Sequence, residues 1–288
     1  MAIVLGVPDV DGLGEVVGVL RAWRSEGSSM QLHPGDLGWF WRFGAEATAG
    51  AVRTWRRGGD VLAIGLVDNP ALLRLAIAPD AEQDEELARR VVDDLSEPDR
   101  GALPAADGCV DVPASTRVHD MLDARGWSSG EPWTPLRREL RDRVPDPGLR
   151  IEVVGPDAAA LRAAVQLASF DRSTFTVERW HAMAAGLPYA DARCLVAYDD
   201  DGAAVAAVTV WSAGPGRPGL LEPMGVHRDH RGRGHGRAIT IAAAAALQEM
   251  GSSSAMVYTP SANRAAVATY LAAGFRPLPE IHDLCRPA

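Results

Sequence analysis

In the second half of the chain, short apolar runs alternate with longer stretches of helical spacing. Three of the runs predict strands, at 151–155, 219–226 and 254–260. Four of the longer stretches predict helices, at 157–170, 177–186, 238–250 and 263–274. Two further apolar runs flank an Asp-Asp-Asp-Gly turn at 199–202, which predicts a hairpin. The last strand-like stretches are FRPL and IHDLC.

The first half repeats much of this order. Helical spacing covers 13–27, 84–95 and 118–127, and 52–79 predicts three strands joined by two turns. The stretch 141–150 combines two prolines, a glycine and charged residues, as linkers do. We therefore predict two domains, 1–145 and 146–288. Two explanations of the shared order stay open. One is an internal duplication, and the other is that two unrelated α/β domains have the same common order of elements.

Composition narrows the class of protein. The 288 residues are 47% hydrophobic and 23% charged, as in ordinary globular chains. The net charge of −9 argues against a nucleic-acid partner. No apolar run approaches the roughly 20 residues of a membrane span. The three cysteines are far apart and show neither zinc spacing nor a disulfide framework, so we expect a reducing, cytoplasmic setting. We also expect a monomer or homodimer.

One segment breaks with the acidic average. Residues 227–238, HRDHRGRGHGRA, hold four arginines, three histidines and three glycines between a predicted strand and a predicted helix. The backbone N–H groups at a helix start attract anions, phosphate above all. Glycines allow close approach and left-handed torsions, and arginines add charge-assisted contacts. We therefore predict a phosphate cradle, whose members are Arg231, Gly232, Arg233, Gly234, Gly236 and Arg237.

Other ligands fit this segment less well. A Walker loop needs lysine, and all 29 basic residues are arginine. A dinucleotide fingerprint starting at Gly232 needs glycine at 237, where Arg237 stands. The three histidines have no carboxylate or cysteine at metal-ligand spacing, so we predict no metal site.

The spacing of Arg231, Gly234 and Gly236 resembles the R-x-x-G-x-G loop of the GCN5-related N-acetyltransferase (GNAT) superfamily. LLEPMGV before the loop, AMVYTP after it and the stretch NRAAVATYLAAGF extend the resemblance over 190–276. The first half is similar in layout only. The resemblance implies an α/β (α+β) fold of tandem lobes, each a mixed, mostly antiparallel sheet flanked by helices. It also implies acetyl-CoA as co-substrate.

The resemblance assigns roles to residues of the second lobe. A bulged strand should open beside its neighbour near Pro223 and Gly225, so that main chain there binds pantetheine. The implied cofactor-binding residues are Met224, Gly225, Val226, Arg231, Gly232, Arg233, Gly234, His235, Gly236, Arg237 and Asn263. Asn263 is also a helix N-cap by position.

The catalytic candidates are Glu222, as general base through water, and Tyr270, as the acid that protonates the departing thiolate. The structural alternative for Glu222 is a half-buried carboxylate paired with an arginine. The structural alternative for Tyr270 is an aromatic residue of the core. Phe170, Phe175 and Trp180 border the implied acceptor site. Trp39, Phe40 and Trp41 are expected in the core.

The first lobe lacks these features. If Ile77 is set against Val226, the acidic stretch 82–87 takes the place of the glycine-arginine loop. VHDMLDARGW at 118–127 mirrors ATYLAAGF at 268–275, and there Leu122 stands in the place of Tyr270. We therefore expect a lobe without a cofactor loop, serving as a scaffold and as a wall of the acceptor pocket.

The expected function is acetyl transfer from acetyl-CoA to a small amine. Two alternatives stay open. One is another acyl-CoA or a thiol or hydroxyl acceptor, and the other is an acyl-CoA-binding regulatory module without turnover.

Overall fold

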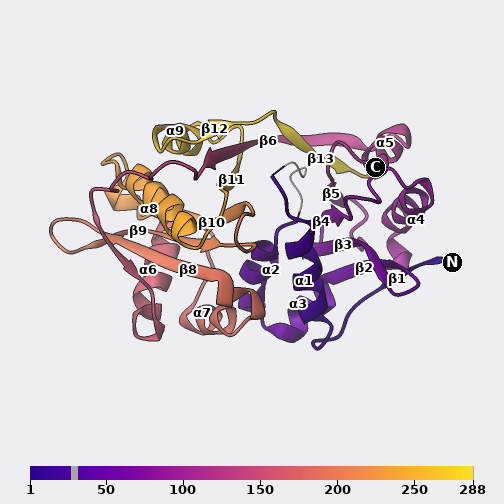
Figure 1. The fold of residues 1–288 in the computed structure, drawn as a ribbon, viewed down its shortest axis with the longest axis horizontal. Helices are drawn as coiled ribbons and strands as arrows, with labels where there is room; N and C mark the ends of the chain where they lie inside the picture. The colour runs from indigo at the N-terminus through magenta and orange to yellow at the C-terminus, as the bar shows by residue number, and fades with distance from the viewer. Residues whose placement is uncertain (27–31, 288) are drawn as a thin grey trace. The chain divides into compact units, whose positions relative to one another are not determined.

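The computed structural model describes residues 1–26 and 32–287 (Figure 1). The chain forms two compact units, and each of them draws on distant parts of the sequence. The first comprises Met1–His33, Ala45–Trp133 and Ile281–Ala288. The second comprises Pro34–Gly44 and Thr134–Glu280.

A mixed sheet organises the first unit. Its strands, in spatial order, are β1 (Ile3–Gly6), β2 (Val52–Arg57), β3 (Asp60–Asn69), β4 (Leu72–Ile77), β5 (Cys109–Asp111), β13 (Ile281–Cys285) and the beginning of β6 (Ser128–Glu139). Neighbours are antiparallel except β4 and β5, which are parallel. The helices are α1 (Leu13–Trp23), α3 (Ala45–Ala51), α4 (Glu85–Ser96), α5 (Arg117–Ala124) and the 3₁₀ turn η2 (Pro98–Arg100). The three strands predicted over 52–79 are confirmed.

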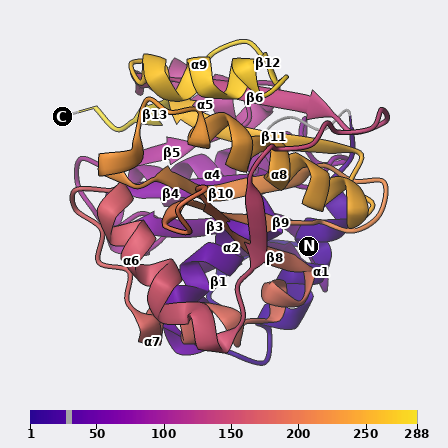
Figure 2. The same cartoon turned by 90° about the vertical axis from the view of Figure 1, so that its left-hand side faces the viewer.

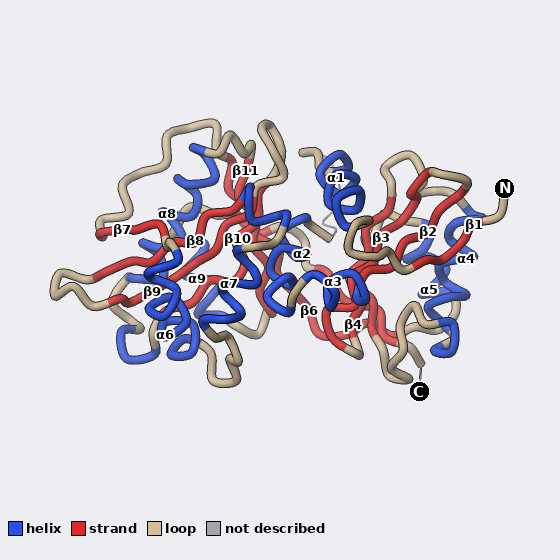
Figure 3. Tube along the Cα trace, turned by 90° about the horizontal axis from the view of Figure 1, so that it is seen from below, coloured by secondary structure: helices blue, strands red, loops and turns tan. Residues whose placement is uncertain are grey.

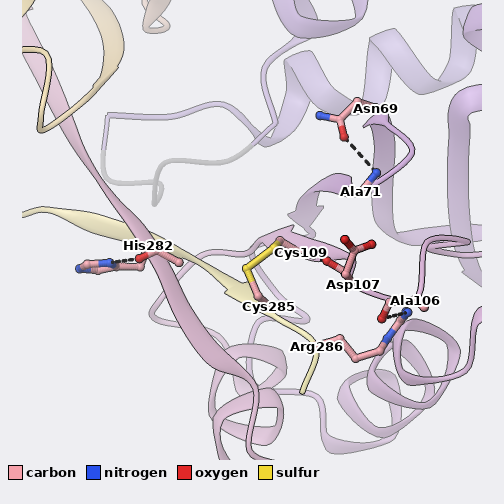
Figure 4. The surroundings of a disulfide bond; sticks show 9 residues. Asn69, Ala71, Ala106, Asp107, Cys109, His282, Cys285 and Arg286 are labelled. Carbon is pink, nitrogen blue, oxygen red and sulfur yellow. Dashed lines mark hydrogen bonds between the residues drawn. A yellow bond between two sulfur atoms is a disulfide. The ribbon is translucent and has the colours of Figure 1, made fainter. Parts of the chain in front are cut away.

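A disulfide joins two strands of the first unit. Cys109 of β5 and Cys285 of β13 are direct partners in the antiparallel ladder, and their sulfurs are bonded (Figure 4). The expectation that the cysteines form no disulfide is therefore wrong, and the argument from it to a reducing compartment lapses. Sequence spacing could not show this pairing, because 176 positions separate the two residues and only the strand register brings them together.

The second unit is built on another mixed sheet. Its strands, in spatial order, are β7 (Arg150–Val153), β8 (Ala192–Tyr198), β9 (Ala204–Trp211), β10 (Gly219–Val226), β11 (Ser254–Pro260) and the end of β6, with β12 (Arg276–Pro277) also on β6. The helices are α2 (Pro34–Phe40), α6 (Ala159–Ser169), α7 (Val177–Ala184), α8 (His235–Glu249) and α9 (Arg264–Ala272). The 3₁₀ turns are η1 (Trp41–Phe43), η3 (Pro156–Ala158), η4 (Leu187–Asp191) and η5 (Arg228–His230).

Helices cover both faces of this second sheet. Alternation along β8 sends Leu195 into one core cluster with Ile239 of α8, and Cys194 into another with Trp180 of α7. Figure 2 shows α8 on one side of β8 and β9, and α6 and α7 on the other. In Figure 3 the paired strands β8, β9 and β10 lie side by side, with helices on both faces of the sheet. The predicted fold class is confirmed: a mixed, mostly antiparallel sheet flanked by helices.

The two units do not follow the single boundary between residues 145 and 146 that the sequence predicts. Residues 134–145 lie in the second unit, and IHDLC supplies β13 to the first. The segment Pro34–Gly44 belongs to the second unit as well. These assignments depend on long-range partners, which local periodicity does not encode.

Aromatic packing holds the segment Pro34–Gly44 in the second unit. Gly38 of α2 lies against the Trp211 ring with no room for a Cβ, and Trp41 packs in the same way on Gly186. Trp39 stacks on Phe175 with ring centroids 5.2 Å apart. The core role expected for Phe40 and Trp41 is confirmed, but the core is that of the second unit.

No helix in the described ranges is long and apolar enough to cross a bilayer.

Candidate active site

A bulge interrupts β10 at the position expected from the sequence. Leu221 pairs with Val210 of β9, whereas the next pair joins Met224 to Val208. One extra residue therefore lies on β10 between these pairs, at Glu222 and Pro223. The bulge expected there is confirmed, while Gly225 stays in the ladder opposite Ala207.

Beyond the bulge, β10 and β11 separate. Their parallel pairing joins only Gly219 to Ala255 and Leu220 to Met256. From 222 to 226, β10 has no ladder partner on that side in the described chain. We call this gap the β10–β11 opening.

Main-chain groups of β10 face the opening. The N–H of His227 donates to the Val205 carbonyl of the β9 side, 2.9 Å away. Along an antiparallel strand, each residue turns both its N–H and its C=O to one side, and the next residue turns them to the other side. Met224 and Val226 therefore turn theirs away from β9, towards the opening. Arg231 Nε donates to the Val226 carbonyl at 3.4 Å, which agrees with this orientation.

The glycine-rich loop starts α8 without a side-chain cap. Gly234 is the N-cap with φ of 87°, and Gly232 has φ of 77°, both in the left-handed region that favours glycine. Open space surrounds the Cβ position of each. The N–H groups of the first helical turn have no intrahelical acceptor, and the positive end of the helix dipole adds to them. Such a helix start binds phosphate groups.

Gly236 has a different role from the other two glycines. It lies within α8, and a Cβ there would come 3.0 Å from Thr269 Cγ2 of α9 and 3.3 Å from a methyl of Val226. Its small size permits close packing of α8 against α9 and the end of β10. The helix begins at His235, three residues before the predicted start at 238.

Most arginines of the segment fasten it to its surroundings. Arg231 donates to the Ser169 carbonyl at 2.7 Å, and Arg228 to the Ala168 carbonyl at 2.9 Å, both at the end of α6. Arg237 donates to the Ala272 carbonyl at the end of α9, 3.0 Å away. Arg233 is exposed and makes no hydrogen bond or ion pair with any described residue.

The three histidines lie together beneath the loop. Ring centroids are 5.1 Å apart for His227 and His230, and 6.3 Å apart for His230 and His235. Burial, with His230 and Arg233 nearby, lowers the pKa of His235, although Asp199 opposes this shift. Among the described residues, no group of three His, Cys, Asp or Glu side chains is placed to hold a metal ion.

The two catalytic candidates differ in their burial. Glu222 is half-buried at the bulge, and its carbonyl accepts a 2.7 Å hydrogen bond from Trp211 Nε1. Tyr270 of α9 is 5% exposed, packs beside Phe275, and has its pKa raised by burial. Asn263 caps α9 as predicted, because its Oδ1 accepts from the Ala266 N–H at 3.2 Å.

The three aromatic acceptor-site candidates separate in the structure. Phe170 is 39% exposed, and a Cβ on Gly225 would come 2.8 Å from its ring, so it lies against β10 at the opening. Phe175 and Trp180 are buried in the core between the sheet and α6 and α7. Trp211, which holds the Glu222 carbonyl, was not anticipated, since its role depends on the bulge register.

Comparison with known proteins gives a family for this architecture. The Acetyltransferase (GNAT) family matches residues 161–275, from α6 to Phe275. A search among curated proteins gives no match.

Solved structures align along the whole chain. A GCN5-related N-acetyltransferase from Sphaerobacter thermophilus is 19% identical with a TM-score of 0.58, covering 99% of this chain and 96% of that one. A tandem GNAT protein from the clavulanic acid biosynthesis pathway is 16% identical with a TM-score of 0.60, covering 99% of each. A GNAT acetyltransferase from Colwellia psychrerythraea is 13% identical with a TM-score of 0.63, covering 100% of each.

The family match over residues 161–275 supports an acyltransferase activity in the second unit. Residues 161–275, which lie within the second unit, match the Acetyltransferase (GNAT) family, and the solved GNAT structures share the fold along the whole chain.

Proposed function

We propose that this protein is an acetyl-CoA-dependent N-acetyltransferase that acetylates a small amine by direct transfer. The second unit is catalytic in this proposal, and the first is a lobe without a cofactor loop. One observation carries the proposal: the opening in β10 lies directly before an uncapped, glycine-started helix.

The residues present fit coenzyme A. The main-chain groups of Met224 and Val226 along the opening suit the amides of a pantetheine arm, which would lie there like an added strand. The N–H groups at the start of α8, from His235 to Arg237, suit a pyrophosphate. Arg233 is an exposed cation of the loop directly before them. Asn263 lies at the start of α9 and has a second role in this proposal, as a contact to the cofactor.

Acetyl-CoA supplies an activated thioester, and the protein residues manage the protons. Glu222 takes the proton from the acceptor ammonium through water, which leaves a neutral amine as nucleophile. A main-chain N–H at the opening stabilises the negative charge that develops on the thioester oxygen. The Tyr270 phenol donates its proton to the departing thiolate, and its raised pKa keeps that proton in place before transfer.

The proposal is tested with the whole chain and a library of small amines. Acetyl-CoA consumption is followed by release of free thiol, against reactions without amine. We expect amine-dependent thiol release and an N-acetylated product identified by mass. A rise in melting temperature with acetyl-CoA, but no acetylated product by mass with any amine, thiol or alcohol, would instead indicate a binding module.

A further inference from the structure

A fully buried arginine lies among the aromatic residues of the second unit. Arg162 of α6 is 0% exposed. Its Nε donates to Cys194 Sγ at 3.2 Å and its Nη1 to Gln166 Oε1 at 2.8 Å. The guanidinium carbon lies 5.3 Å from the centre of the Phe175 ring. Sulfur and a neutral amide are thus its hydrogen-bond acceptors.

This positive charge has no counter-ion within the part of the chain that the structure describes. No carboxylate of a described residue forms an ion pair with Arg162, and its Nη2 is buried without any hydrogen-bond partner. Buried charges are normally paired, because removing an ion from water costs several kcal/mol after relaxation. A guanidinium also presents a fork of N–H groups that matches a carboxylate.

A second buried donor in the same cluster lacks an acceptor. Trp180 of α7 is 2% exposed, and its Nε1 has no partner. Tyr189 links the two donors. Its ring lies 6.1 Å from that of Trp180, and its phenol is close enough to Arg162 for the guanidinium to affect its pKa. Arg162 Nη2 and Trp180 Nε1 are thus two buried donors without an acceptor among the described residues, and an oxygen anion would satisfy such donors.

The sheet register places this cluster in line with the bulge. Cys194 of β8 pairs with Thr209 of β9, and Thr209 lies opposite the extra residue of β10. Strands are spaced by 4.7–4.9 Å, so Cys194 and the bulge at Glu222 are separated by about 10 Å. Arg162 contacts Cys194 and therefore lies within the length of a small molecule from Glu222.

Helix α6 connects the cluster with the opening along one face. Arg162, Gln166 and Ser169 are all buried and follow one another along α6. Ser169 and Phe170 contact the Gly225 position at the opening. Polar residues on the core-facing side of an amphipathic helix need a reason, since this side normally packs with apolar residues.

We infer that Arg162, with the Trp180 N–H, binds a carboxylate of the acceptor, so that the substrate is an amine that also carries a carboxylate. This inference rests on the proposed function, since it concerns the acceptor of the same site. The amine end would lie at the bulge beside Glu222.

The test uses amines paired by length and basicity. Amino acids from glycine to 6-aminohexanoate are each compared with the alkylamine that lacks the carboxylate. For the length that fits, kcat/KM should favour the amino acid by about 10- to 100-fold, the usual effect of a charged hydrogen-bonding pair. Arg162→Met removes the charge at similar volume and should abolish this preference. Arg172→Met, an exposed arginine in the loop after α6, is the matched control and should retain it.

A second readout separates this inference from the proposed function. With CoA present and no acetyl group to transfer, the preferred amino acid should raise the melting temperature more than its alkylamine, except in Arg162→Met. If no amine is acetylated but this selective shift persists, the proposed function fails and the anion site stands. If Arg162→Met does not fold, Trp180→Phe removes the indole N–H while keeping an aromatic ring and should reduce the preference. Equal use of both members of every pair, or a preference unchanged in the variants, would overturn the inference.

Discussion

At the scale of single residues, the site depends on where side chains meet the bulge of β10. Trp211 Nε1 holds the Glu222 carbonyl, and α2 leaves no free space on the Trp211 ring at Gly38. This contact fixes the backbone that carries Glu222. A general base needs such fixed placement within reach of the proton it removes.

Glu222→Gln keeps the shape of the side chain but loses its basicity. Turnover should fall by roughly 10²–10⁴-fold at neutral pH, the usual contribution of a positioned base. The loss should shrink as pH rises, because more of the amine is already neutral and needs no base. The melting-temperature shift with acetyl-CoA should survive and serves as the control. Full activity of Glu222→Gln at neutral pH would mean that the carboxylate is structural.

Tyr270→Phe removes the phenol and keeps the ring that packs beside Phe275. We expect kcat to fall by about 10²-fold with acetyl-CoA binding intact, because the thiolate then leaves without its acid. Burial raises the pKa of Tyr270 above its ordinary value near 10, so the phenol stays protonated at every pH of a normal assay. The wild-type rate should therefore show no alkaline decline from Tyr270 below pH of about 10. Unchanged kcat in the variant would make Tyr270 a core aromatic only.

Sequence reasoning could reach some residues of the site and not others. The order of the motifs along β10, the loop and α9 predicted the bulge and the Asn263 cap, and the structure confirms both. The contacts of Trp211 and Arg162 are different. They arise from strand register and from which helix face is buried, and neither can be derived from spacing along the chain alone.

At the scale of elements, the start of α8 is the most specific local structure of the second unit. Gly234 begins a 15-residue helix with a positive φ and no side-chain cap. Ser, Thr, Asp or Asn are the usual caps, since their oxygens satisfy the first N–H groups. A glycine leaves those groups available for a ligand.

Gly234→Glu places bulk and negative charge at this helix start. The variant should lose the rise in melting temperature that acetyl-CoA causes in the wild type, because a ligand stabilises only the state that binds it. The matched control is Gly216→Glu. Gly216 is exposed, has φ of 71° and has open space at its Cβ position. It lies near the C-terminal end of α8, where its N–H donates a hydrogen bond to the Gly251 carbonyl. A shift that persists in Gly234→Glu would remove the phosphate cradle from the loop.

The elements themselves could be predicted better than their partners. Hydrophobic periodicity predicted β10 and β11 with the bounds that the structure has. It could not predict that α2 packs in the second unit or that β13 enters the sheet of the first, since both depend on contacts far apart in sequence. The disulfide was missed for the same reason.

At the scale of the whole molecule, the two units differ in charge at equivalent places. In the first unit, α4 begins at the acidic stretch that the alignment of Ile77 with Val226 sets against the glycine-rich loop. Asp84 caps this helix by accepting from the Leu87 N–H at 2.9 Å, and it pairs with Arg57 at 2.8 Å. Leu122, opposite Tyr270, is fully buried. In the first unit, the carboxylate of Asp84 thus caps the helix start at which a phosphate would otherwise bind.

We therefore expect one molecule of acetyl-CoA per chain. Calorimetric titration should give a single site, because a helix start already capped by Asp84 repels a pyrophosphate. Gly234→Glu should then abolish all the measured heat of binding. Two equivalent sites in the wild type, or a remaining site in that variant, would show that the first unit also binds cofactor.

The place of β13 sets the order in which the protein can be completed during synthesis. This strand lies between β5 and β6, but it is translated after the whole stretch Thr134–Glu280 of the second unit. At ordinary translation rates that interval lasts roughly 7 to 30 s. For its duration the facing edges of β5 and β6 are unpaired, and unpaired edges invite association with other chains. The nascent first unit therefore waits for its last strand and its disulfide, whereas the second unit already has every segment it needs.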